Sequence, residues 1–211
     1  MPWGAIIFGA VAFAVLLSRW RWAEILGADW LNQWGVVPLR LFADLAISVH
    51  WWQSPELPTL ASALFIHVGF GHLIGNLVFL WLFARRVEQR LGWVFSLGMY
   101  LLAGIVANFW AAYQAPTSAA PIIGSSGVTS ALLGAFLVLF PGSRIGVIVP
   151  LGLYLQLIRV PALLLIGSWI ALQLMYTFYV PGIGAVAWWT HVAGFITGLL
   201  VAAPARWYRT H

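Results

Sequence analysis

Residues 124–141 read GSSGVTSALLGAFLVLFP, an uncharged and largely apolar segment. It opens with a pair of serines between two glycines, Gly124-Ser125-Ser126-Gly127, and Pro141 ends it. A segment of this length and composition predicts a helix inside a membrane. Polar groups inside such a helix are costly and usually functional, so the serine pair is the first candidate for chemistry.

The composition of the whole chain also indicates a membrane protein. Of the 211 residues, 63% are hydrophobic and 7% are charged, and the mean hydropathy is +0.95. A soluble domain carries roughly 25% charged residues. The net charge of +5 comes from arginines at segment ends, which favours lipid headgroups and not nucleic acid as the partner. There is no Cys, so disulfide and thiolate chemistry are excluded.

The apolar runs predict an all-α polytopic membrane protein, a single domain over residues 1–211 built as a bundle of six transmembrane helices. The expected spans are residues 4–18, 65–84, 93–112, 124–141, 161–180 and 186–205.

The segments between these spans carry their own expectations. Residues 19–58 are a long outward loop, and its many Trp residues suggest that it rests partly in the membrane surface; an ordinary folded loop is the alternative. Residues 142–160 are expected to be a linker at the interface. Gly and Pro permit bending around Pro181-Gly182-Ile183-Gly184, which predicts a mobile cap.

Arginine distribution orients the expected spans. Seven arginines fall on one side and three, all in residues 19–58, on the other; the seven are Arg85, Arg86, Arg90, Arg144, Arg159, Arg206 and Arg209. Because cytoplasmic loops carry the excess of basic residues, both termini are expected in the cytoplasm. The composition, with no Lys and no Cys, suggests a bacterial source. The expected location is the bacterial inner (plasma) membrane, as a multi-pass protein.

Three polar residues in different spans lie at similar depth. His72 lies 13 residues before Arg85, Ser126 lies 18 before Arg144, and His191 lies 15 before Arg206. At ~1.5 Å per helical residue these separations are ~20, ~27 and ~22 Å. In a hydrocarbon core ~30 Å thick, all three fall in the outer third. The agreement predicts one shared site that opens to water on the non-cytoplasmic side.

Small residues offer a way for the fourth and sixth spans to meet. Gly127, Ala131 and Gly134-Ala135 form a small face on one, and Gly194 and Gly198 form a GxxxG on the other. Such faces let two helix backbones approach closely. A close approach could bring His191 within reach of Ser126 as the base of a serine nucleophile, although packing alone would explain the same pattern.

His72 and Asn76 share one helix face, because they are four residues apart. Both can donate hydrogen bonds, as an oxyanion hole requires, and the backbone N–H of Ser126 would add a third donor. An interhelical hydrogen-bonded pair is the alternative. His67 lies nearer the outer boundary and is expected to be a structural donor to the long loop.

Other protease chemistries lack their residues here. No Glu follows a His at the HExxH spacing of a zinc protease, and no Asp follows Asp44. Past the first loop Glu88 is the remaining acid, at the cytoplasmic end. The expected machinery is therefore a Ser–His pair, with the histidine oriented by packing and not by a carboxylate.

Four motifs, read in order, resemble those of the rhomboid intramembrane serine proteases of the six-span bacterial type, over roughly residues 55–200. They are His67-Val-Gly-Phe-Gly-His72-Leu-Ile-Gly-Asn76, Val87-Glu88-Gln89-Arg90-Leu91-Gly92, Gly124-Ser125-Ser126-Gly127 and His191-Val-Ala-Gly194-Phe-Ile-Thr-Gly198. Ser130 stands where some members carry an aromatic side chain that stacks on the histidine.

The resemblance implies a role for each residue and a class of substrate. Ser126 would be the nucleophile and His191 the general base, while His72, Asn76 and the Ser126 backbone would bind the oxyanion. Substrates would be membrane proteins cut in or beside a transmembrane helix, and no cofactor is implied.

Two other functions stay open at this level. A rhomboid fold without protease activity could bind or escort membrane clients. A haem protein could use His72 and His191 as axial ligands, and an absorption spectrum without a Soret band would remove that possibility.

Overall fold

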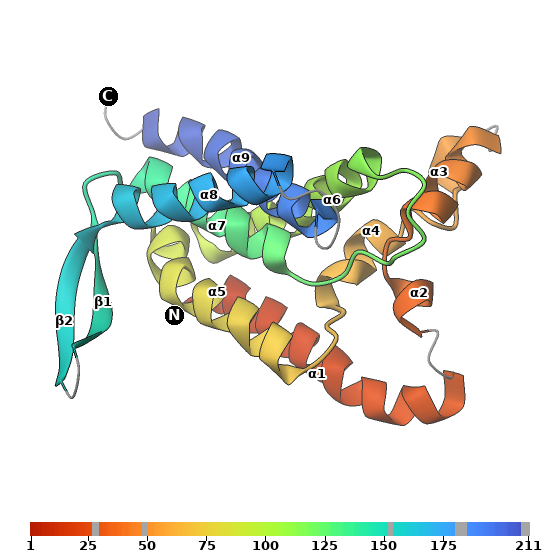
Figure 1. The fold of residues 1–211 in the computed structure, drawn as a ribbon, viewed down its shortest axis with the longest axis horizontal. Helices are drawn as coiled ribbons and strands as arrows, with labels where there is room; N and C mark the ends of the chain where they lie inside the picture. The colour runs from red at the N-terminus through yellow and green to blue at the C-terminus, as the bar shows by residue number, and fades with distance from the viewer. Residues whose placement is uncertain (27–29, 48–49, 152–153, 180–184, 208–211) are drawn as a thin grey trace.

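The computed structural model describes residues 1–26, 30–47, 50–151, 154–179 and 185–207, and most of these are helical (Figure 1). The long helices are α1 (Trp3–Leu26), α5 (Phe70–Leu91), α6 (Trp93–Gln114), α7 (Ser126–Leu139), α8 (Ala162–Tyr179) and α9 (Ala185–Trp207). The short helices are α2 (Trp30–Trp34), α3 (Pro38–Ile47) and α4 (Thr59–Ser62), with 3₁₀ turns at Trp51–Gln53 and Ala63–Phe65.

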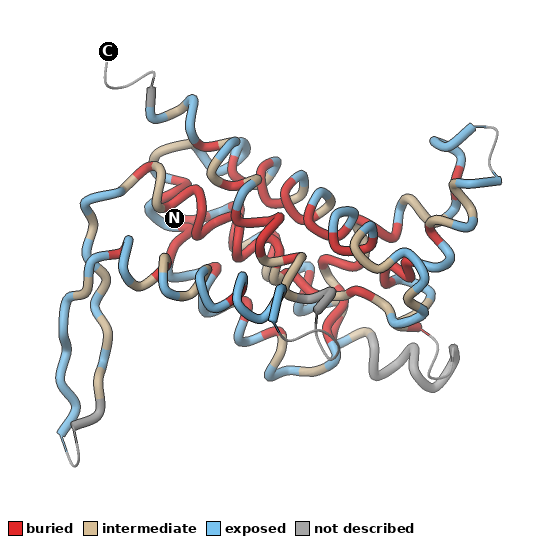
Figure 2. Tube along the Cα trace, turned by 45° about the horizontal axis from the view of Figure 1, so that its top comes forward, coloured by how far each residue is buried: buried red, intermediate tan, exposed pale blue. Residues whose placement is uncertain are grey.

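Helix α7 lies at the centre of the bundle, and most of its residues are buried (Figures 1 and 2). Its closest partner is α9, and glycines make the approach possible. A Cβ on Gly194 would overlap the carbonyl of Gly127, and a Cβ on Gly198 would overlap the carbonyl of Ala131. The expected small-residue contact between these two helices is therefore confirmed.

A buried carboxylate joins α1 to α5 and α6. Glu88 on α5 accepts hydrogen bonds from the backbone N–H groups of Gly4 (2.9 Å) and Ala5 (2.7 Å) and from the hydroxyl of Tyr100 (3.0 Å). The first N–H groups of a helix have no partner within the helix, and a negative charge there is favourable. Glu88 thus fixes the start of α1 against the rest of the bundle.

Several described helices are long and apolar enough to cross a membrane. Trp93–Gln114 and Trp188–Arg206 qualify alone, and Thr59–Phe65 with Phe70–Leu91 qualifies as a pair bent by 93°. Three shorter apolar helical stretches lie in the remaining expected spans: Trp3–Ser18, Ser126–Leu139 and Ala162–Tyr176. The candidate spans fit an integral membrane protein, and six crossings remain a prediction.

The expectation of an all-α chain is wrong between α7 and α8. In place of a linker, β1 (Arg144–Leu151) and β2 (Tyr154–Pro161) pair antiparallel, with Arg144 opposite Pro161, and project from the bundle (Figure 1). The sequence 145–149, IGVIV, is rich in β-branched residues, which favour extended backbone. Prolines at 150 and 161 disfavour a helix there.

Two expected boundaries also differ from the structure. The long loop expected over 19–58 contains the end of α1 and the helices α2 and α3, so it is largely helical where it is described. The span expected from residue 65 is interrupted at residues 66–69, and α5 begins at Phe70. Gly69 and Gly71 have low helix propensity, which favours a break at this point.

Candidate active site

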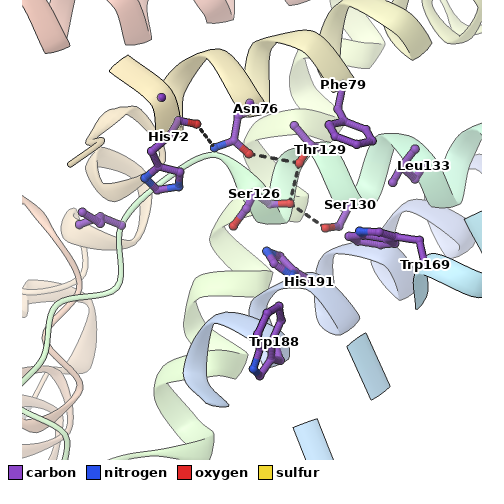
Figure 3. A pocket seen from close by; sticks show the side chains of 13 residues that line it. His72, Asn76, Phe79, Ser126, Thr129, Ser130, Leu133, Trp169, Trp188 and His191 are labelled. Carbon is purple, nitrogen blue, oxygen red and sulfur yellow. Dashed lines mark hydrogen bonds between the residues drawn. The ribbon is translucent and has the colours of Figure 1, made fainter. Parts of the chain in front are cut away.

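A cavity of about 460 Å³ lies where α5, α7, α8 and α9 come together (Figure 3). All four side chains singled out from the sequence line it, namely His72, Asn76, Ser126 and His191. Its other lining residues are Gly71, Gly75, Phe79, Ile123, Thr129, Ser130, Leu133, Trp169 and Trp188. The fold therefore gathers the candidate residues from three helices at one place.

Ser126 is the first residue of α7. Its backbone N–H belongs to the first helical turn, where no acceptor within the helix is available. Its carbonyl accepts hydrogen bonds from the hydroxyls of Thr129 (2.9 Å) and Ser130 (2.7 Å). Those two hydroxyls are thereby engaged at the wall of the cavity, whereas the Ser126 side chain faces the space between α5 and α9 (Figure 3).

The turn before Ser126 depends on a glycine. Gly124 has φ +105°, a backbone conformation that side chains disfavour. A Cβ at this position would lie 2.7 Å from Cε1 of His72. The bare backbone therefore lets the turn curve into α7 while the imidazole of His72 lies directly against it.

Helix α5 contributes donors on the other side of Ser126. Asn76 accepts a hydrogen bond from the hydroxyl of Thr129 through Oδ1 (3.4 Å) and donates from Nδ2 to the backbone carbonyl of His72 (3.0 Å). An amide nitrogen carries two hydrogens, so one stays available to a ligand. Nδ1 of His72 is buried without a hydrogen-bond partner among the described residues. Asn76 can therefore accept the interhelical hydrogen bond from Thr129 and still donate a hydrogen bond to a ligand.

His191 reaches the cavity from α9 and is held by a residue that the sequence reasoning missed. Its Nδ1 lies 2.8 Å from Oε1 of Gln173 on α8. An amide oxygen only accepts, so Nδ1 carries the hydrogen and Nε2 is left as the free base. Trp169 and Trp188 flank the imidazole, each with ring centroids 5.8 Å from it. Packing, and not a carboxylate, was expected to orient His191; the structure adds the amide of Gln173 to the packing by these rings.

The hydroxyl of Ser126 and the ring of His191 face the same cavity from α7 and α9 (Figure 3). Among the hydrogen bonds of the described residues, none joins these two side chains. Catalytic hydrogen bonds are often long in the absence of substrate and tighten only when it binds.

A different Ser–His pair is hydrogen bonded. The Oγ of Ser125 lies 3.1 Å from Nε2 of His67, whose Nδ1 lies 3.2 Å from the carbonyl of Phe65. The carbonyl accepts, so Nδ1 donates to it and Nε2 accepts from Ser125. His67 therefore bonds the turn before α7 and not the long loop, which corrects the expectation for this residue. It is 0% exposed and Ser125 is 2% exposed, so neither is open to a substrate.

One signal could have pointed to Gln173. It is an amide in an otherwise apolar run, and polar side chains at such positions are rarely without a role. The expected cap at Pro181-Gly182-Ile183-Gly184 lies outside the described residues.

Comparison with known proteins identifies the family. Residues 48–208 match the Rhomboid domain family. Over 98 residues the chain is 33% identical to the "Putative rhomboid protease YdcA" of Bacillus subtilis (strain 168). This match covers 46% of each of the two chains. Over 139 residues it is 29% identical to "RHOMBOID-like protein 12, mitochondrial" of Arabidopsis thaliana. This match covers 58% of this chain and 39% of that protein.

The mostly helical fold with its candidate membrane spans fits an integral membrane protein, and a serine- and histidine-lined cavity lies within its bundle. The chain belongs to the rhomboid family. The matched segments span less than half the length of the curated relatives above.

Proposed function

We propose that this rhomboid-family chain is an intramembrane serine endopeptidase that cleaves transmembrane segments of membrane proteins. The single observation that carries the proposal is the shared cavity, in which Ser126, His191, His72 and Asn76 meet although they come from three helices. Helix packing by itself would not require a hydroxyl, two imidazoles and an amide to converge on one open space.

The proposed reaction uses these groups in sequence. Ser126 Oγ attacks the carbonyl carbon of the scissile peptide bond while Nε2 of His191 takes the hydroxyl proton. The negative oxygen that results accepts hydrogen bonds from the backbone N–H of Ser126, the free hydrogen of Asn76 Nδ2 and a ring N–H of His72. His191 then protonates the leaving amine, and water hydrolyses the acyl-enzyme by the same route.

Gln173 supports this assignment of roles. Its Oε1 holds the Nδ1–H tautomer of His191, so the unprotonated Nε2 is the nitrogen available to the serine. In this position an amide takes the orienting part that a carboxylate plays in a Ser-His-Asp triad. A neutral partner avoids placing an unpaired carboxylate inside the membrane.

The proposed setting is the inner (plasma) membrane of a bacterium, with six crossings and both termini in the cytoplasm. The cavity then opens toward the non-cytoplasmic side, which supplies the water that hydrolysis needs. The partners proposed for the chain are transmembrane protein substrates and membrane lipids.

The test is cleavage of a transmembrane substrate by purified protein in lipid vesicles. Ser126→Ala is expected to abolish cleavage. The other two hydroxyls described at the cavity, those of Thr129 and Ser130, are both hydrogen bonded to the backbone carbonyl of Ser126. Ser130→Ala is the matched control, since it removes a hydroxyl from the same cavity one turn away and is expected to keep activity. Undiminished cleavage by the Ser126 variant would refute the proposal and favour a rhomboid protein that binds clients without cutting them.

A further inference from the structure

A second cavity, of about 320 Å³, is lined by Arg86, Gln89, Arg90 and Phe140. The three residues on α5 are spaced i, i+3 and i+4 and share one helix face, and Phe140 directly follows α7. The 14 residues of α5 from Asn76 to Arg90 span ~21 Å, which places this cavity at the opposite end of the helix from the proposed active site. It offers two guanidinium groups, an amide and an apolar wall.

No described carboxylate neutralises these two arginines. In the part of the chain that the structure describes, the ion pair recorded is that of Arg40 with Glu56. Glu88 is near Arg86 and Arg90 in sequence, but its carboxylate accepts from Gly4, Ala5 and Tyr100 in the interior. The cavity therefore carries a net positive charge.

One donor of this cavity's arginines is also unsatisfied. Nε of Arg90 is buried and has no hydrogen-bond partner among the described residues. A buried donor without an acceptor is unfavourable, so the protein does not fully satisfy the guanidinium of Arg90. Guanidinium groups match phosphate oxygens in geometry as well as charge. The chemistry that fits the cavity is an oxyanion of the phosphate class.

The surface beside the cavity indicates where that phosphate comes from. Val78 and Leu82 precede Arg86 at four-residue steps on α5, and they are 49% and 61% exposed. An exposed apolar row that ends in arginine is typical of a helix with acyl chains along its side and headgroups at its end. We propose that the cavity formed by Arg86, Gln89, Arg90 and Phe140 binds the phosphate of an anionic phospholipid headgroup.

Native mass spectrometry of the full chain tests this site directly. The protein is released from detergent micelles that contain equal amounts of phosphatidylglycerol and phosphatidylcholine with the same acyl chains. The wild type is expected to retain phosphatidylglycerol preferentially. Arg86→Gln and Arg90→Gln are each expected to weaken retention about fivefold, as loss of one arginine near an anionic lipid implies.

Arg85→Gln is the matched control, because Arg85 is an exposed neighbour that does not line the cavity. It is expected to retain the lipid nearly as the wild type does. An equal loss of lipid retention in this variant would mean that general surface charge holds the lipid, and it would contradict a specific site in the cavity. Retention by both Arg86→Gln and Arg90→Gln at the wild-type level would overturn it as well.

Two further measurements keep the result interpretable. Arg86 is exposed, so Arg86→Gln is expected to fold even if Arg90→Gln does not, and thermal unfolding of each variant checks this. Inorganic phosphate at millimolar concentration is expected to leave the bound lipid in place. Displacement of the lipid by inorganic phosphate would assign the site to the free anion and contradict the proposal.

Discussion

Ser125 and Ser126 are adjacent in the chain, yet their side chains face different histidines in different surroundings. Ser125 is hydrogen bonded to His67, and both are almost fully buried. Ser126 faces the cavity that His191 also lines, without a hydrogen bond between the two. A short Ser–His contact is therefore not by itself evidence of a nucleophile, because a substrate must also reach the hydroxyl.

The largest expected effect separates the two histidines. His191→Ala is expected to lower cleavage about 10²–10⁴-fold, the usual contribution of a general base. His67→Ala is expected to lower the free energy of unfolding by about 1–3 kcal/mol, because it leaves the buried Ser125 hydroxyl without its partner. Cleavage rates and thermal unfolding of both variants check this, with rates normalised to folded protein. Equal loss of activity in folded His67→Ala would erase the distinction between the pairs.

Loss of the oxyanion donor is expected to come next in size. Asn76→Ala removes the free Nδ2 hydrogen and is expected to lower kcat about 10²–10³-fold, as for other oxyanion-hole donors. Thr129→Val is the control, because it removes the hydroxyl that bonds Asn76 Oδ1 while leaving the amide in place. It is expected to cost far less in kcat. A Thr129→Val variant as slow as Asn76→Ala would mean that Asn76 acts through helix packing.

Much of the cavity could be predicted from the sequence. Arginines at segment ends gave a common scale of depth, and His72, Ser126 and His191 do line one cavity. The depth of Ser126, counted as 18 helical residues up to Arg144, was overestimated, because α7 ends at Leu139 and the chain from there to Arg144 is not helical. The 13 residues from Ser126 to Leu139 rise ~20 Å, close to the ~20 Å estimated for His72 by the same rise.

The features that could not be predicted depend on partners that are distant in sequence. Gln173 has no spacing relation to His191, so its hydrogen bond needs α8 and α9 to be in place first. His67 and Ser125 are likewise brought together by the turn at Gly124. The hairpin of β1 and β2 was missed for a different reason, because an apolar run between two spans also suits an interfacial linker.

A smaller effect tests the turn that separates the two serines. Gly124→Ala is expected to destabilise the fold by about 1–3 kcal/mol, because alanine disfavours positive φ and its Cβ would collide with the ring of His72. Gly98→Ala on α6 is the control, since a Cβ there meets nothing within 4 Å. Thermal unfolding in matched lipid checks both. Equal melting temperatures for the two variants would contradict the requirement for glycine at this turn.

The smallest expected effect concerns the tautomer of His191. Gln173→Ala removes one hydrogen bond of about 1 kcal/mol, so kcat is expected to fall about fivefold while KM stays unchanged. Nitrogen NMR of the histidine rings gives an independent readout, with His191 in the Nδ1–H form in the wild type and in a mixture in the variant. An unchanged tautomer with unchanged kcat would exclude the positioning role.

Mapping of a covalent label is the most direct test of Ser126 as the nucleophile. The wild-type protein is treated with a fluorophosphonate serine probe, digested, and sequenced by tandem mass spectrometry across residues 124–130. The label is expected on Ser126, and it is expected to disappear in Ser126→Ala and to persist in Ser125→Ala. A label on Ser125, or none on either serine in folded protein, would contradict it.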